Sequence, residues 1–279
     1  MTVLDLTASV LMFSFGMLGI STNAFVMTNL IHPDSRNVFN YLCSLRALIN
    51  ILILLTVFML DFLPATVLGH SPWSAEVETS LILFGNGIYS MNQAVTGVLA
   101  INRLFGIYAL SYNKYAKTLT VASILSYVCW RVYSLGVESL GKIGKCNLYF
   151  SITELAWESN CEEDEIPLYT VGVIVVFLGI INMVILAAIA KFYYTLSAIT
   201  EEIKKERMRR NTTRFLQTII QDIIYFIDML FTFKISSMCN SRACSFITKT
   251  IVWEMRYGLF PRAMVKKRQS HSRRYNAIP

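Results

Sequence analysis

The chain has 279 residues, of which 54% are hydrophobic and only 15% are charged, and its formal net charge is +7. A soluble globular domain typically carries about 25% charged residues, so this composition excludes an ordinary soluble protein. Apolar runs long enough to cross a bilayer recur along most of the sequence, and all six prolines fall between these runs or at their ends. The chain is therefore predicted to be an all-α membrane protein with several spanning helices.

Seven spanning helices are predicted. A hydrocarbon core about 30 Å thick requires roughly 20 apolar residues per helix. Runs that meet or approach this length cover residues 9–31, 39–61, 79–101, 119–137, 168–190, 214–235 and 245–260. Residues 1–260 are thus predicted to form a seven-helix bundle, and residues 261–279 a basic tail. The first run starts almost at Met1 without a basic leader, so we expect it to serve as an uncleaved signal anchor.

The connectors between the predicted spans alternate in charge. The first, third and fifth connectors, with the C-terminal tail, hold 16 Lys and Arg and four acids, whereas the N-terminal tail and the other three connectors hold three Lys and Arg and ten acids. Positive residues near span ends stay in the cytoplasm, so the N-terminus is predicted to be extracellular and the C-terminus cytoplasmic. These basic residues lie beside spans, which favours contact with the lipid bilayer over nucleic-acid binding.

Four of the six cysteines lie in predicted extracellular connectors. Cys146 and Cys161 bracket the long connector after the fourth span, and Cys239 and Cys244 bracket the short one after the sixth. The extracellular side is oxidising, so two local disulfides are expected, with Cys146–Cys161 the stronger candidate and the connectivity left open. The three histidines are scattered and zinc-type cysteine spacing is absent, so no metal or cofactor is predicted.

Polar side chains recur within the apolar runs. Asn23 and Asn50 are expected either to form ordinary interhelical hydrogen bonds or to belong to a central polar network. Because the predicted N-terminal tail is very short, a small-molecule ligand is expected to bind between the outer halves of the helices. Asp228 either pairs with a basic residue such as Lys234, Lys249 or Arg256, or binds a cationic ligand. The candidate ligand-contacting residues are Asn86, Tyr89, Ser90, Gln93, Asp228 and Trp253.

Several short motifs resemble one family of receptors. At the inner end of the third span, INRLFGIYALSYNKY contains the pair Asn102-Arg103, followed by Tyr112 and Lys114. This pattern resembles the Asp-Arg-Tyr region of rhodopsin-like G-protein-coupled receptors, and it is more similar to the nematode serpentine chemoreceptors of class Srx. The stretches NYLCSLRALIN, CNLYFSITELAWESNC, RFLQTIIQD and WEMRYGLF resemble further Srx motifs, so the resemblance extends over nearly the whole chain.

This resemblance implies a chemosensory receptor of the plasma membrane, in the cilia of sensory neurons, that binds a small molecule and activates a heterotrimeric G protein. It implies that Arg103 restrains the inactive bundle and then contacts the G protein when the sixth helix moves outward. Asn102 would lie beside Arg103, and Tyr112 and Lys114 would lie in the coupling loop. A ligand that biases a two-state helix shift is the general mechanism of such receptors.

Other classes of protein are weighed against this prediction. A transporter or channel could use Arg46, Arg131, Asp222 and Asp228 along a path, although no internal repeat relates the two halves of the sequence. A receptor-like product that does not couple to a G protein is a further alternative. An enzyme is not expected, because the spans contain no Ser/His/Asp set and no paired-acid motif.

Overall fold

A computed structural model describes residues 2–30, 38–108, 147–159, 238–239 and 241–258, together with single residues between 122 and 235. Most of the predicted fourth, fifth and sixth spans, and the whole tail, lie outside these residues. The helices and strands are α1 (Val3–Leu30), α2 (Val38–Ile53), the π-helix η2 (Leu54–Phe62), α3 (Leu63–Leu68), α4 (Ala75–Tyr108), β1 (Leu148–Ser151), β2 (Ala156–Ser159), α8 (Arg242–Ser245), the π-helix η5 (Phe246–Ile251) and α9 (Val252–Gly258).

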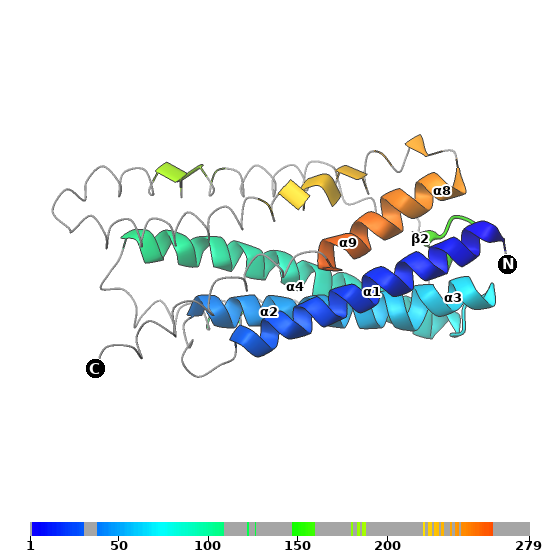
Figure 1. Ribbon diagram of the computed structural model, residues 1–279, viewed down its shortest axis with the longest axis horizontal. Coiled ribbons are helices and arrows are strands. Elements are labelled where there is room, and N and C mark those ends of the chain that lie inside the picture. The colour runs from blue at the N-terminus through cyan, green and yellow to red at the C-terminus, as the bar shows by residue number, and fades with distance from the viewer. Residues whose placement is uncertain are drawn as a thin grey trace, which may run out of the picture.

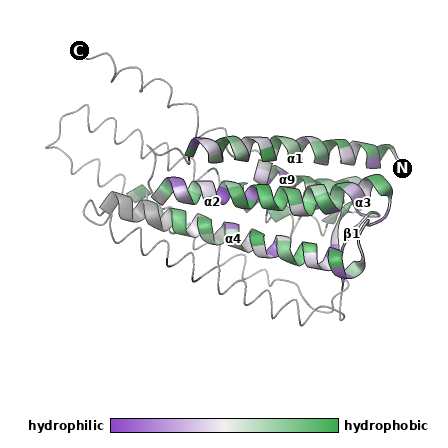
Figure 2. Ribbon diagram, turned by 90° about the horizontal axis from the view of Figure 1, so that it is seen from below, coloured by the Kyte–Doolittle hydropathy of each residue, from purple (hydrophilic) through white to green (hydrophobic). Residues whose placement is uncertain are grey.

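The long helices lie side by side along the long axis of the molecule (Figure 1). The first helix, α1, packs against α2 and α9, and α2 packs against α4. The N-terminus, α3, α8 and the two strands gather at one end of this bundle (Figures 1 and 2). We call this end, which is predicted to be extracellular, the outer end.

Two of the described helical segments, Val3–Leu30 and Phe39–Leu68, are long and apolar enough to cross a bilayer. They contain residues 9–30 of the first predicted span and the whole of the second. Large apolar side chains point away from the bundle, and Leu6, Phe13 and Phe25 of α1 are each more than half exposed. Figure 2 shows apolar residues along these helices rather than confined to one buried stripe. Exposed apolar surface of this extent suits contact with lipid.

The second helix continues past its predicted end at residue 61. The sequence places Pro64 beyond the span, because proline usually ends or kinks a helix. In the structure, η2 runs directly into α3, which contains Pro64 and ends at Leu68; the φ of +73° at the next residue, Gly69, suits glycine. Pro64 has no N–H to donate to the Leu60 carbonyl four residues earlier. The indole N–H of Trp73 donates to that carbonyl (2.8 Å), so the proline is accommodated within the helix.

A β-hairpin forms in the long extracellular connector, where the sequence predicted no strands. Strands β1 and β2 pair antiparallel, with Phe150 opposite Trp157. The connecting turn contains Leu155, whose φ of +52° is unusual for a residue with a side chain. The Leu155 side chain is fully buried in the hydrophobic core. Burial of this side chain offsets the cost of its left-handed backbone.

The seventh span is one continuous helix over residues 242–258, because the residues at both junctions of α8, η5 and α9 have right-handed helical backbone angles. It begins three residues before the predicted start at residue 245. The reason is local: Ser241 caps the helix, and its hydroxyl accepts a hydrogen bond from the Cys244 main-chain N–H (3.3 Å). The span is therefore longer at its outer end than the apolar run indicates.

Two glycines of α4 differ in their surroundings, and this difference gives a prediction. A Cβ atom at Gly85 would overlap with Cγ2 of Val57, whereas a Cβ atom at Gly97 would meet no atom within 4 Å. Gly85→Ala should lower the unfolding midpoint in detergent, since overpacking costs about 1–3 kcal/mol. Gly97→Ala is the matched control, and its midpoint should stay equal or rise, because alanine favours a helix by about 1 kcal/mol. Equal midpoints for the two variants would contradict close packing of α4 on η2.

Candidate functional site

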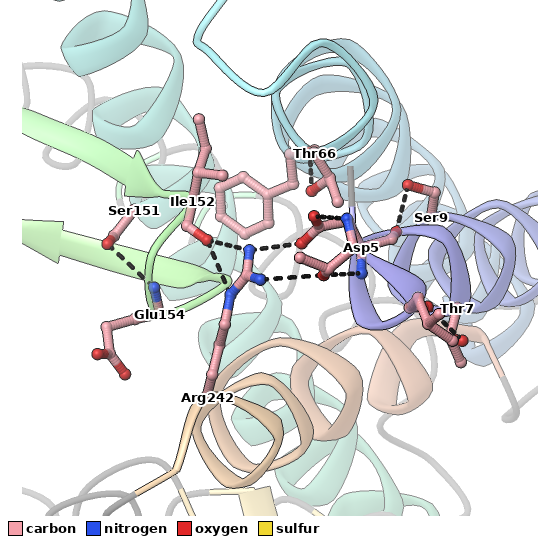
Figure 3. Close-up of polar contacts among 11 residues, drawn as sticks. Asp5, Thr7, Ser9, Thr66, Ser151, Ile152, Glu154 and Arg242 are labelled. Carbon is pink, nitrogen blue, oxygen red and sulfur yellow. Dashed lines mark hydrogen bonds and ion pairs between the residues drawn. The ribbon is translucent and has the colours of Figure 1, made fainter.

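Three chain segments meet at the outer end of the bundle (Figure 3). Arg242, the first residue of α8, pairs with the Asp5 carboxylate of α1 (2.5 Å) and donates from Nε to the Ile152 carbonyl in the hairpin turn (3.1 Å). The Thr2 main-chain N–H also donates to Asp5 (2.6 Å). We call Asp5, Arg242 and the Ile152 carbonyl the outer clasp. It joins the starts of the first and seventh helices to the hairpin.

The hairpin also bonds to the outer end of α4. Thr79 and Leu148 exchange two hydrogen bonds: the Leu148 N–H donates to the threonine hydroxyl oxygen (3.1 Å), and that hydroxyl donates to the Leu148 carbonyl (3.2 Å). The buried Glu78 carboxylate accepts a hydrogen bond from the Phe150 N–H (2.7 Å). These bonds satisfy backbone groups of β1 that have no partner in β2, and they fix the hairpin across the outer end of the bundle.

The seventh helix adds two further constraints at the same end. The Thr250 hydroxyl donates to the Leu155 carbonyl of the hairpin turn (2.7 Å). Cys239 and Cys244 form a disulfide, with their Cα atoms 5.5 Å apart, as one of the two expected local bridges. This disulfide closes the short loop that carries Arg242 of the outer clasp.

Five aromatic side chains form a continuous group beneath the hairpin, which we call the aromatic cluster: Phe58, Phe62, Tyr89, Phe150 and Trp253. The Phe150 ring stacks on Phe62 (centroids 4.3 Å apart), and Phe58 meets both Phe62 (5.4 Å) and Trp253 (5.3 Å) edge to face. Tyr89 lies 6.3 Å from Trp253. The sequence predicted Tyr89 and Trp253 as site residues but missed the phenylalanines, although the four-residue spacing of Phe58 and Phe62 places them on one helix face.

Asp228, in the predicted sixth span, pairs with Arg256 of α9 (Nη1 to Oδ2, 2.5 Å), and both side chains are buried. The Arg256 guanidinium also lies over the rings of Tyr89 (4.7 Å) and Tyr257 (5.5 Å). Such cation–π contacts add to the stability of a desolvated arginine. Of the two interpretations of Asp228 left open by the sequence, the structure provides the basic partner, so the charge of Asp228 is balanced within the protein.

Three buried asparagines form a chain of side-chain hydrogen bonds deeper in the bundle, which we call the asparagine chain. The Asn92 amide of α4 donates to Asn50 Oδ1 of α2 (3.0 Å), and the Asn50 amide donates to Asn23 Oδ1 of α1 (3.1 Å). The Asn23 amide donates to the main-chain carbonyl of Tyr257 in α9 (2.8 Å). The asparagine chain therefore joins four helices, and Asn23 and Asn50 occupy its centre.

The remaining predicted site residues are on α4 or outside the described residues. Asn86, Ser90 and Gln93 belong to α4, as do Asn102 and Arg103, which lie in the last two turns of that helix before its end at Tyr108. The helix thus continues beyond the predicted inner edge of the third span. The predicted residues Tyr112, Lys114, Cys146 and Cys161 lie outside the part of the chain that the structure describes.

Apolar helices around a polar and aromatic interior, with a hairpin across the outer end, are the architecture of a helical membrane protein. The family of serpentine type 7TM GPCR chemoreceptors, Srx, matches residues 13–259, and the chain belongs to this family. The resemblance found in the sequence is thereby confirmed, as is the all-α, seven-transmembrane fold class. The family comprises multi-pass receptors of the plasma membrane and is not a class of enzymes. No curated protein matches the chain at a significant level.

Proposed function

We propose that the protein is a chemoreceptor that binds a small molecule inside the helix bundle and activates a heterotrimeric G protein. Membership of the Srx family carries this proposal. The family also supports a plasma-membrane location, and we propose the cilia of chemosensory neurons as the particular site.

The proposed ligand wall lies beneath the hairpin. Tyr89 and Trp253 belong to the aromatic cluster, and Trp253 is 7% exposed, so a ligand in contact with it is shielded from water. An aromatic and aliphatic wall with a few polar groups suits a small amphipathic or volatile molecule. The other proposed members of the wall are Asn86, Ser90, Gln93 and Asp228.

The proposed coupling face lies at the opposite end of α4. Arg103 and Asn102 are in the last turns of that helix, and Tyr112 and Lys114 follow them in the chain. The asparagine chain ties α1, α2, α4 and α9 together through buried hydrogen bonds. These four helices would form the fixed part of the receptor, against which the sixth helix moves when a ligand binds.

Expression of the full chain in a reporter cell that carries a promiscuous G protein, followed by a screen of small odorants, tests this proposal. At least one odorant should raise the reporter signal in a dose-dependent way, and the signal should vanish in cells that lack the G protein. Ion current or solute uptake without a G protein would instead indicate a channel or transporter. Odorant binding that never activates a G protein would indicate the coupling-defective alternative.

A further inference from the structure

Asp61, on η2, is a buried acid whose charge nothing in the described structure balances. Its side chain is 0% exposed, and neither carboxyl oxygen has a hydrogen-bond partner among the described residues. A carboxylate buried in this way is strongly destabilising until a cation or a proton reaches it. The two ion pairs found in the described part of the chain involve other acids, Asp5 with Arg242 and Asp228 with Arg256.

A second buried acid lies close to Asp61. Glu78 is 4% exposed, and its carboxylate is near enough to Asp61 for the two groups to repel each other electrostatically. Glu78 also accepts the hydrogen bond from the Phe150 N–H of the hairpin. Asp61 is seven residues from the outer end of α3 and Glu78 is three residues from the outer end of α4, so both lie within about 10 Å of the outer helix ends. The two acids therefore lie near the outer end of the bundle, and Glu78 bonds directly to the hairpin.

The aromatic cluster meets one of these acids through the hairpin, because Glu78 accepts a hydrogen bond from the main chain of Phe150, a member of the cluster. Asp61 precedes Phe62, whose ring stacks on Phe150 of the hairpin and lies 6.2 Å from Trp253. Aromatic faces attract cations through their ring quadrupoles, and this attraction strengthens where water is excluded. An acid beside several aromatic rings is the combination of groups that recognises an organic ammonium ion.

We propose that the ligand of this receptor is a small organic cation, a protonated amine with an apolar body, and that Asp61 provides its counter-charge. Glu78 adds negative potential from α4, and the aromatic cluster receives the apolar body. This inference rests on the proposed function, because it names the class of ligand for the proposed site. In this proposal Asp61, rather than Asp228, binds the positive charge of the ligand, because Asp228 already pairs with Arg256.

Thermal unfolding of the full-length receptor in lipid nanodiscs tests the proposal without any G protein. The probes are 2-phenylethylamine and its uncharged counterpart 2-phenylethanol. The amine should raise the unfolding midpoint in a saturable way, and the alcohol should not, since it brings no charge to Asp61. An equal shift with the alcohol, or no shift with the amine, would overturn the proposal, and neither result depends on a variant that must fold.

Three variants then test which acid provides the counter-charge for the bound amine. Asp61→Asn keeps the shape and removes the charge, so the apparent affinity for the amine should fall about tenfold or more, as expected for a lost charge-assisted hydrogen bond. Glu78→Gln can still accept from Phe150, and should cause a smaller loss. Glu254→Gln is the matched control. Like Asp61, Glu254 is 0% exposed and has no hydrogen-bond partner in the described structure. Glu254, however, faces Gly16 and is 12 residues further along the seventh helix than Arg242. The affinity of the Glu254→Gln receptor for the amine should be unchanged.

The outcomes separate this proposal from the proposed function. Amine affinity that survives Asp61→Asn, or falls equally in Glu254→Gln, overturns the assignment to Asp61. If only uncharged odorants activate the G protein in the reporter cell, the receptor function stands and the cationic ligand is wrong. If the amine binds through Asp61 but never activates a G protein, the ligand class is supported and the proposed signalling function fails.

Discussion

Asn50→Leu should lower the unfolding midpoint of the receptor and its level at the cell surface more than the other substitutions considered. Asn50 is the middle member of the asparagine chain, where it both donates to Asn23 and accepts from Asn92. Leucine can do neither, so an acceptor on Asn23 and a donor on Asn92 lose their partner in a buried site. Each unsatisfied polar group costs about 1–3 kcal/mol, which is a large fraction of the stability of a typical protein.

Asn29→Leu provides the control for this prediction. Asn29 also donates to a main-chain carbonyl, that of Phe25, but it is exposed and bonds within its own helix (2.6 Å). Its replacement by leucine should change the free energy of unfolding by about 0.5 kcal/mol or less, as most surface substitutions do, so the unfolding midpoint should shift little. Midpoints measured in the same detergent compare the two variants. Equal losses would show that the asparagine chain contributes no more than a surface side chain.

Arg103→Glu should abolish ligand-evoked G-protein activation while the receptor still reaches the surface. Arg103 lies in the last turns of α4, at the inner end of the bundle. Reversal of its charge would remove charge-assisted contacts to the G protein and add repulsion, and the lost contacts alone correspond to about tenfold or more in potency. Nucleotide exchange on the G protein, normalised to surface receptor, measures the effect.

Arg36→Glu is the control for net charge. Arg36 lies in the first predicted cytoplasmic connector, so its reversal changes the total charge of the inner face by the same amount. Its ligand-evoked response should stay close to that of the unchanged receptor. A full response from Arg103→Glu would contradict the coupling role that the family resemblance assigns to Arg103.

The first two spans could be predicted from the sequence because their apolar runs are long and contain few charges. The end of the second could not, since Pro64 indicates a helix end. The residue that satisfies the open Leu60 carbonyl, Trp73, comes from the following loop. No local sequence pattern shows that the Trp73 indole will donate to the Leu60 carbonyl. A helix end that depends on such a tertiary contact cannot be predicted from the sequence.

The sequence could predict which types of residue form the candidate site, but not which of them contact each other. Polar residues on apolar helices indicated interior contacts, and Asp228 was recognised as a charge that requires a partner. The sequence offered several basic residues for it, and only the position of α9 beside Asp228 selects Arg256. Asp61 is not predicted as a site residue from the sequence, because an acid near the end of an apolar run ordinarily lies at the membrane surface, whereas this one is fully buried.

The hairpin across the outer end has a consequence for the timing of the sensory response. It is held by hydrogen bonds to α4 and the seventh helix, and its Leu155 and Phe150 are packed in the core. At the ligand site that we propose, a molecule that enters or leaves from the water must wait until several of these contacts open together, which is a rare event compared with the movement of an isolated loop. We expect long residence times, so that the receptor reports a concentration averaged over many encounters rather than each brief pulse.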